Sequence, residues 1–155
     1  MRQDKSGPLA KELLEQEGYQ VVSLQVLPDD RESLSAAMKK ICDEGRADLL
    51  LTTGGTGLSP RDWTPEATMD IAQRMVPGIS EGMRAYSLSI TKRAMLSRGV
   101  SAIRERTWII NLPGSPKAVQ ENLEYLLPVL PHGLDVLTGA AQECAETTKR
   151  GGEKE

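Results

Sequence analysis

The chain contains one short apolar run that ends abruptly in glycines. Residues 48–57 have the sequence Asp-Leu-Leu-Leu-Thr-Thr-Gly-Gly-Thr-Gly. An apolar run of this length, bounded by glycine, predicts a buried strand. Glycines just past the carboxyl end of a strand let the backbone turn and offer bare N–H groups to an anion. We therefore expect a strand followed by a ligand-binding loop.

Helical and strand-like segments alternate along the chain. Helices are predicted at 8–18, 34–45, 64–76, 79–89, 116–127 and 132–137, and strands at 19–27, 49–53 and 107–112. This alternation predicts a three-layer α/β fold with a mostly parallel, doubly wound sheet and helices on both faces. In such folds ligands bind outside the carboxyl ends of the strands. The turns at 28–29, 54–62 and 113–117 should therefore meet in one crevice.

The two ends of the chain differ from this pattern. The sequence opens at a helix start, whereas an α/β domain of this kind usually opens with a strand. We therefore expect a sheet that lacks the usual first strand, with unpaired backbone and an apolar slot in its place. One domain is predicted over residues 1–139, while residues 140–155 are small, polar and charged and are predicted to be disordered.

Composition excludes several classes of function. Of 155 residues, 3% are aromatic, none is Phe, and the net charge is −3, which disfavours a nucleic-acid-binding role. No segment reaches the roughly 18 apolar residues of a membrane span, and no signal core follows Met1. Cys42 and Cys144 lie far apart and are expected to be free thiols in the cytoplasm. His132 is the only histidine, which disfavours a zinc site or a Ser–His–Asp triad.

The glycine loop is the first candidate for chemistry. Gly54, Gly55, Thr56 and Gly57 match neither a P-loop nor a Gly-x-Gly-x-x-Gly motif. A plain tight turn is the alternative interpretation. The position of the loop, directly after a predicted buried strand, favours an anion-binding role.

Two aspartates at predicted strand ends are the next candidates. Asp62 follows the glycine loop, and Asp29 follows the preceding predicted strand. Mg²⁺ prefers one or two carboxylates together with phosphate oxygens, so the pair could hold one cation. For each aspartate the alternative is a helix cap.

Basic and hydroxyl side chains could complete an anion site. Ser115 and Lys117 begin a predicted helix, whose N-terminus attracts anions through free N–H groups and its dipole. A capping turn with an exposed lysine is the alternative. Ser97 and Arg98 lie in an irregular segment, where Arg98 could bind phosphate in bidentate fashion or be an ordinary surface arginine.

At these residues the chain resembles the MogA/MoaB family of molybdenum-cofactor biosynthesis proteins, which includes the G domain of gephyrin. The matching motifs are residues 51–57, 61–68, 77–78, 83–84, 96–99 and 111–117, and the match covers about residues 4–139. The resemblance implies a homotrimeric α/β protein that binds molybdopterin. It further implies that the protein adenylylates the terminal phosphate of molybdopterin with Mg-ATP and releases pyrophosphate.

The resemblance also assigns residues. Asp29 and Asp62 match two acidic positions that matter for the adenylylation step, and we expect both to be catalytic and to bind Mg²⁺. The pterin and phosphate pocket maps onto Gly54, Gly55, Thr56, Gly57, Arg61, Ser97, Arg98, Gly114, Ser115 and Lys117. A molybdenum-insertion protein is a further expected partner. The alternatives are a MoaB-like molybdopterin-binding or scaffold protein, an unrelated nucleotide hydrolase, and a homologue disabled by loss of the first strand. Trp63 departs from the family, where a smaller aliphatic residue is usual.

Overall fold

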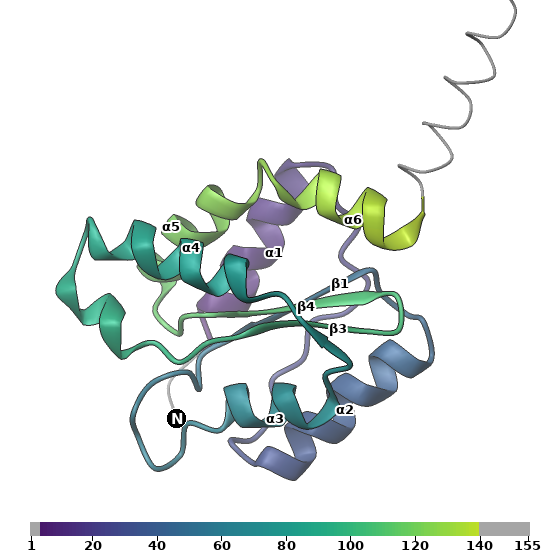
Figure 1. Cartoon of the computed structure of the whole chain (residues 1–155), viewed down its shortest axis with the longest axis horizontal. Helices are drawn as coiled ribbons and strands as arrows, with labels where there is room; N and C mark the ends of the chain where they lie inside the picture. The colour runs from purple at the N-terminus through teal and green to yellow at the C-terminus, as the bar shows by residue number, and fades with distance from the viewer. Residues whose placement is uncertain (1–3, 140–155) are drawn as a thin grey trace, which may run out of the picture.

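A mixed β-sheet lies between two layers of helices in the computed structural model, which describes residues 4–139 (Figure 1). The sheet has four strands in the order β1-β4-β3-β2. Their bounds are Leu49–Thr53 for β1, Arg74–Met75 for β2, Ser101–Arg104 for β3 and Thr107–Leu112 for β4. Both predicted strands at 49–53 and 107–112 are thereby confirmed.

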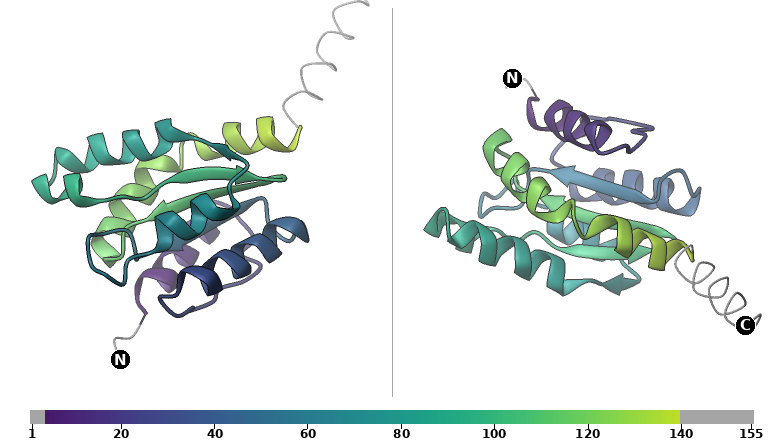
Figure 2. Two further views of the ribbon diagram at one scale, coloured as in Figure 1. Left: turned by 60° about the horizontal axis from the view of Figure 1, so that its bottom comes forward. Right: turned by 90° about the horizontal axis from the view of Figure 1, so that it is seen from above.

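The helices cover both faces of this sheet, as the views in Figures 1 and 2 agree. On one face lie α1 (Ser6–Gln16), α4 (Pro77–Leu88), α5 (Pro116–Leu126) and α6 (Leu130–Thr138). On the other lie α2 (Arg31–Asp43) and α3 (Thr64–Ile71), and a short 3-10 helix, η1 (Lys92–Leu96), follows α4. The predicted three-layer α/β class is confirmed.

Strand pairing is more mixed than predicted. β1 pairs with β4 in parallel, whereas the β4–β3 and β3–β2 pairs are antiparallel. Two residues connect β3 to β4, and one of them, Glu105, has a φ of 53°. So short a connection can join only antiparallel strands, because a parallel pair needs a crossover of a dozen or more residues. The sequence analysis missed β2 and β3, which are only two and four residues long.

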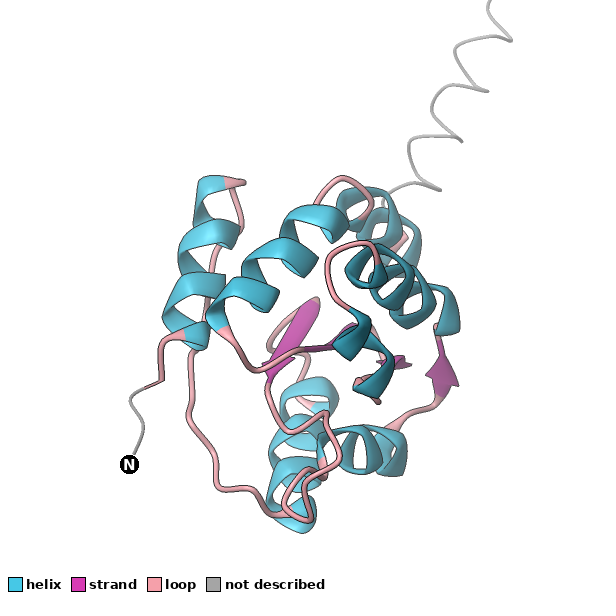
Figure 3. Ribbon diagram, turned by 90° about the vertical axis from the view of Figure 1, so that its left-hand side faces the viewer, coloured by secondary structure: helices cyan, strands magenta, loops and turns pink. Residues whose placement is uncertain are grey.

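The predicted strand at 19–27 is wrong as a description of this structure. The segment is a loop that connects α1 to α2 (Figure 3). Its apolar side chains Val22, Leu24 and Val26 are 60%, 48% and 77% exposed. A β-branched sequence favours a strand only where a neighbour is available to pair with, and no strand in residues 4–139 pairs with this segment.

Two apolar clusters hold the layers on the sheet. The larger cluster joins α1, α4, α5 and α6 to one face of the sheet, around Trp108, Ile110 and Leu112 of β4. The smaller cluster joins α2 and α3 to the other face around Ile109. All six residues of β4 are buried, because β4 is an interior strand covered on both faces.

Asn111 of β4 is a buried polar group whose side chain links three elements. Its Nδ2 donates to Thr52 Oγ1 of β1 and to Thr68 Oγ1 of α3, both at 3.0 Å. Its Oδ1 accepts from Val100 N at 3.1 Å, just before β3. Each hydrogen-bonding group of this amide is therefore used, as a side chain 1% exposed requires.

Replacing Asn111 should be costly. Asn111→Ala removes three hydrogen bonds and leaves Val100 N without that acceptor, so the free energy of unfolding should fall by about 2–4 kcal/mol. Urea denaturation followed by circular dichroism measures this loss. Gln120→Ala, at an exposed position of α5, is the control. A loss below about 0.5 kcal/mol for Asn111→Ala, within the range of surface substitutions, would contradict the role assigned to the amide.

Candidate functional site

The glycine loop begins after β1 with two residues in a backbone conformation that only glycine adopts easily. Gly54 and Gly55 have φ values of 84° and 69°, in the left-handed region. Gly55 O accepts from Thr64 N at 3.1 Å, so the loop is fastened to the start of α3. A Cβ at Gly55 would collide with Thr64 Oγ1. Gly55 is thus needed for the packing of the loop on α3 as well as for its turn.

The turns after β1 and β4 meet at one edge of the sheet. A Cβ at Gly114 would lie 3.2 Å from Gly54 Cα, so the two backbones are in close contact. Ser6 Oγ, in the first turn of α1, donates to Gly114 O at 2.6 Å. Ser115 caps α5, with its Oγ accepting from Ala118 N at 3.2 Å. The predicted convergence of the 54–62 and 113–117 turns is confirmed for Gly54 and Gly114.

Asp29 is not a helix cap. The cap of α2 is Asp30, whose carboxylate accepts from Ser33 N at 2.8 Å and from Ser33 Oγ at 2.6 Å. These hydrogen bonds lower the pKa of Asp30. Asp29 instead lines a groove that also includes Gly54 and Thr64. Asp29 and Gly54 thus line one groove, which extends along β1 as far as Asp48.

Arg98 fastens the glycine loop to the turn that carries Asp62. Its Nε donates to Gly57 O at 2.8 Å, its Nη2 to Asp62 O at 2.8 Å and its Nη1 to Glu66 Oε2 at 2.7 Å. Its backbone N donates to Thr56 O at 2.7 Å. The interpretation of Arg98 as an ordinary surface arginine is wrong. A planar fork of donors can hold three acceptors in fixed geometry, which a lysine cannot do.

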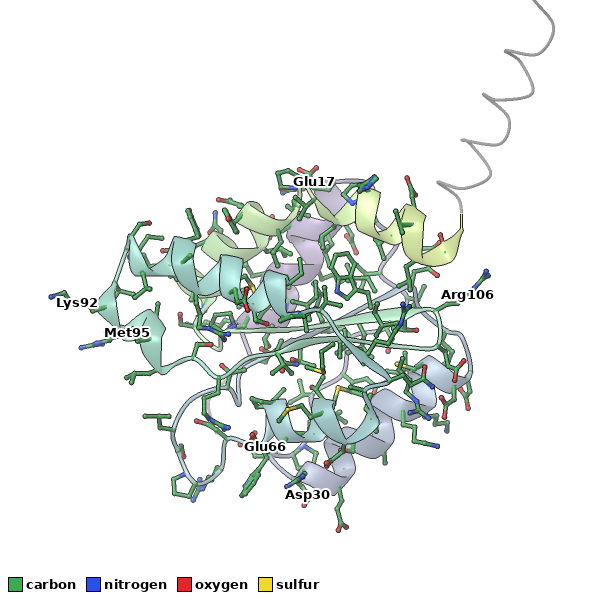
Figure 4. The ribbon with its side chains drawn as sticks, in the orientation of Figure 1. Glu17, Asp30, Glu66, Lys92, Met95 and Arg106 are labelled. Atoms are coloured by element: carbon green, nitrogen blue, oxygen red, sulfur yellow. The ribbon has the colours of Figure 1, made fainter. Side chains whose placement is uncertain are left out.

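Glu66 is the site residue that the sequence analysis missed. It lies in the first turn of α3 (Figure 4), and its Oε2 is 2.7 Å from Arg98 Nη1. Its hydrogen bond from Arg98 lowers its pKa, although partial burial opposes the shift. An acidic residue in the first turn of a helix is ordinary, because it complements the helix dipole. The sequence alone therefore does not distinguish a glutamate that pairs with Arg98 from one that only complements the helix dipole.

Asp62 lies in a hollow of about 420 Å³ beside the glycine loop. The hollow is lined by Gly57, Leu58, Ser59, Pro60, Asp62, Trp63, Glu66 and Arg98. Asp62 Oδ2 accepts from Ser59 N at 3.0 Å, and no hydrogen bond is recorded for Oδ1 among residues 4–139. Asp62 thus has one carboxylate oxygen held by its own turn and one available to a ligand.

Trp63 forms one side of this hollow. This residue is 40% exposed, and its Nε1 donates to Pro60 O at 3.0 Å. The Arg31 guanidinium lies 5.8 Å from the ring centroid, within cation–π range. Arg31 is itself fixed by a bidentate ion pair with Asp70, in which its Nε and Nη2 donate to the two carboxylate oxygens, each at 2.7 Å. The residue that departs from the family is therefore in contact with α2 through Arg31.

Seven predicted site residues lie outside the lining of both hollows, namely Gly55, Thr56, Arg61, Ser97, Gly114, Ser115 and Lys117. The Lys117 side chain is 82% exposed, with its Nζ 3.8 Å from Glu121 Oε1. Arg61 is exposed, and Ser97 Oγ accepts from Gly99 N at 3.4 Å. Among the described residues, no group of three or more His, Cys, Asp or Glu side chains could hold a metal ion. A cation at Asp62 and Asp29 would need further ligands from a substrate.

Comparison with known proteins decides the family. Residues 1–132 match the family model described as a probable molybdopterin binding domain. The chain belongs to this family. In residues 4–139, no helix has the length and apolar character needed to cross a membrane.

Relatives of known name agree with this assignment. A molybdopterin adenylyltransferase of Helicobacter pylori is 41% identical over 141 residues, which are 88% of this chain and 79% of the relative. The Escherichia coli molybdopterin adenylyltransferase is 41% identical over 79% of this chain and 64% of its own length. Among solved structures, the Thermus thermophilus molybdopterin biosynthesis enzyme MoaB has a TM-score of 0.83 at 46% identity, covering 89% of this chain and 87% of that one.

Stability should depend on pH through the Arg98–Glu66 pair. The folded state lowers the pKa of Glu66 from its ordinary value of 4.5, so the contribution of the pair is present above that value. The contribution is lost as the pH falls through the lower, folded-state pKa. Wild type should exceed Glu66→Gln in free energy of unfolding by about 1 kcal/mol at pH 7, a figure limited by the exposure of both side chains.

Urea denaturation at pH 7 and at about pH 3 measures this difference. Glu124→Gln, on the exposed face of α5, is the matched control and should show little change at either pH. An advantage of wild type over Glu66→Gln that stays constant between the two pH values would contradict the assigned ion pair.

Proposed function

We propose that this chain transfers the adenylyl group of Mg-ATP to the terminal phosphate of molybdopterin. The observation that most supports this reaction is the set of hydrogen bonds that Arg98 donates to the glycine loop and to the Asp62 turn. Its guanidinium holds the glycine loop and the Asp62 turn against each other at the carboxyl edge of the sheet. The curated relatives that carry the name molybdopterin adenylyltransferase favour transfer over the binding-only alternative.

The reaction needs little covalent participation from the protein. A phosphate oxygen of molybdopterin attacks the α-phosphorus of ATP, the new P–O bond forms, and the bond to the β-phosphate breaks to release pyrophosphate. A phosphate monoester is already anionic at neutral pH, so no strong base is required. The task of the chain is to position two phosphorylated substrates and to neutralise their charge.

We assign the binding of phosphate to backbone groups and the helix α5 N-terminus. Gly55, Thr56 and Gly57 would offer N–H groups, and the start of α5 would add the positive end of its dipole. Gly54 and Gly114 would let the substrate approach the backbone closely. Arg61, Ser97, Ser115 and Lys117 would complete the pterin and phosphate pocket, with Lys117 able to move because its side chain is exposed.

Magnesium would enter with ATP as part of the substrate. Asp62 has one oxygen available for it, and Asp29 is not occupied by helix capping. Hard oxygen donors of this kind suit Mg²⁺, which keeps waters and phosphate oxygens as its other ligands. When bound, the ion neutralises phosphate charge, while Asp62 and Asp29 orient it. Arg98 holds Asp62 through its backbone carbonyl, and two of its five N–H donors remain for a substrate.

We further propose that the chain acts as a cytoplasmic homotrimer and hands its product to a molybdenum-insertion protein. The trimer rests on the family resemblance and on exposed apolar side chains around the end of α4 and η1. These are Leu88, Ile90, Met95 and Leu96, each more than 40% exposed. The Met95 end of this region projects from the molecule (Figure 4).

Asp62→Asn should separate binding from turnover. The amide keeps the shape of the side chain but lacks the charge that a cation requires. We expect molybdopterin binding within about threefold of wild type and a kcat at least about a hundredfold lower, the loss typical when charge stabilisation is removed. Pyrophosphate release from molybdopterin and Mg-ATP measures turnover. Asp135→Asn, on the exposed face of α6, is the control. Equal turnover by wild type and Asp62→Asn would sink the assignment.

Gly57→Ala should disturb Asp62 without disturbing the fold. A Cβ at Gly57 would lie 2.9 Å from Asp62 Oδ2, closer than side chains tolerate, so the carboxylate must move. Since a misplacement of about 1 Å can cost a hundredfold, we expect kcat to fall at least about tenfold. Gly78→Ala, where a Cβ meets nothing within 4 Å, is the control. Unchanged kcat in Gly57→Ala would show that the position of Asp62 is not limiting.

A further inference from the structure

One arginine of α4 lies on the buried side of that helix. The buried residues of Pro77–Leu88 include Ser80 and Met83, and Arg84 is half-buried at the next position. Residues four apart on a helix share one face, so Arg84 lies on the same side as Ser80. A charged group in such a place needs hydrogen-bond partners, because burial without them is costly. The 83–84 motif carries part of the family resemblance, yet it supplies none of the candidate site residues.

The partners of Arg84 are the two backbone carbonyls on either side of Arg98. Arg84 Nη1 donates to Gly99 O at 3.0 Å and to Ser97 O at 3.4 Å. Gly99 is buried, and no backbone donor is recorded for either carbonyl within residues 4–139. A buried carbonyl without a donor destabilises the folded state. Arg84 is therefore the group that satisfies this segment on the side of α4.

The segment 97–99 has one edge on α4 and the other on the glycine loop. Ser97 is extended, with φ −75° and ψ 128°. In extended chain, alternate residues turn their peptide groups to opposite edges. The carbonyls of Ser97 and Gly99 accordingly face Arg84, while Arg98 N faces away from it and donates to Thr56 O at 2.7 Å. Arg84 thus takes the place of a neighbouring strand along one edge of this segment.

Close contacts hold the same segment on its other sides. A Cβ at Gly99 would lie 3.2 Å from Asn111 O and 3.6 Å from Thr56 Cγ2, so the backbone here touches both β4 and the glycine loop. Val100 N donates to Asn111 Oδ1 at 3.1 Å. Asn111 and Thr56 therefore fix the segment toward the sheet and the loop, and Arg84 fixes it toward α4.

The position of the Arg98 backbone determines what its side chain can reach. From this backbone the guanidinium donates to Gly57 O and to Asp62 O, each at 2.8 Å. Such bonds keep their strength over only about 0.5 Å of donor–acceptor distance. A shift of the Arg98 backbone would therefore either break these bonds or displace the turn that carries Asp62.

We propose that Arg84 is a positioning residue for the reaction, acting through Arg98 on the turn that carries Asp62. Arg84 lines neither hollow in the described part of the chain, so we assign it no contact with a substrate. It holds the backbone of Arg98, and the Arg98 side chain holds Asp62. The effect on turnover rests on the proposed adenylyl transfer, whereas the effect on the Arg98 backbone does not.

Arg84→Met removes the donors and keeps most of the apolar stem. Because a misplacement of about 1 Å can cost a hundredfold, we expect kcat to fall at least about tenfold, with KM values within about threefold of wild type. Pyrophosphate release from molybdopterin and Mg-ATP measures both. Arg84→Lys keeps a donor on a stem of similar length and should restore kcat to within about threefold of wild type. Arg74→Met, at an exposed position of β2, is the matched control. Equal kcat in Arg84→Met and Arg74→Met would overturn the proposal.

The same substitution in Asp62→Asn shows whether the effect passes through Asp62. Residues that act as a unit have non-additive effects on turnover. Arg84→Met should therefore lower kcat by less than about threefold once Asp62 is already Asn. A full tenfold loss in that background would overturn the proposal, because Arg84 would then act on another part of the site.

Amide hydrogen exchange followed by NMR tests the contact without turnover. The Arg98 amide, bonded to Thr56 O, should exchange at least about tenfold faster in Arg84→Met than in Arg74→Met, while the buried Ile109 amide of β4 stays unchanged. Equal exchange of Arg98 in the two variants would overturn the proposal. Failure of Arg84→Met to fold, or equal acceleration of both amides, would also overturn it, because Arg84 would then serve stability alone.

The two measurements separate this proposal from the proposed function. A wild-type protein that releases no pyrophosphate would overturn the adenylyl transfer and, with it, the effect of Arg84 on turnover. The exchange of the Arg98 amide would then still decide whether Arg84 holds the Arg98 backbone.

Discussion

The parallel pairing of β1 with β4 is the constraint on which the site depends. Its register sets Thr53 beside Leu112, so both strands end at the same level. The turns that follow are then in contact at Gly54 and Gly114, and the buried Asn111 amide secures the pair by its bond to Thr52. A register shift of one residue would move Thr53 away from Leu112 and separate the two turns. The crevice is thus a consequence of how two strands pair.

Arg98 fixes the glycine loop that follows β1, which the strand pairing alone does not hold in place. Loops of glycine, threonine and serine have little apolar surface with which to fix themselves. Arg98 supplies the fixed points, since its planar group bonds to Gly57 O, Asp62 O and Glu66 at once. Charge-assisted bonds of this kind are stronger than neutral ones and retain strength in a partly shielded hollow. Arg98 thereby fixes the backbone of the glycine loop relative to the turn that carries Asp62.

The sequence predicted the parts of this arrangement that follow from local pattern. The strand at 49–53, the strand at 107–112 and the Ser115 cap all have local signals, and each is confirmed. The sequence could not predict contacts between residues that lie far apart along the chain. Glu66 and Arg98 are 32 residues apart, and nothing in either neighbourhood announces the ion pair. The alternative interpretation of Asp29 as a helix cap could not be settled either, because Asp29 and Asp30 are chemically equal in sequence and only the fold shows that Asp30 reaches Ser33.

The failed strand at 19–27 and the open edge of β1 have one physical origin. A strand is defined by its neighbour, so residues with β-branched side chains remain a loop when the adjacent position in the sheet is empty. Within the described residues, Leu49–Thr53 pair with β4 alone, and they are half-buried although β4 beside them is fully buried. Segment 20–27 and β1 line the same groove, and so do Asp29 and Gly54, the residues that follow them along the chain. The position of Asp29 relative to the glycine loop therefore depends on how the 20–27 segment lies against β1.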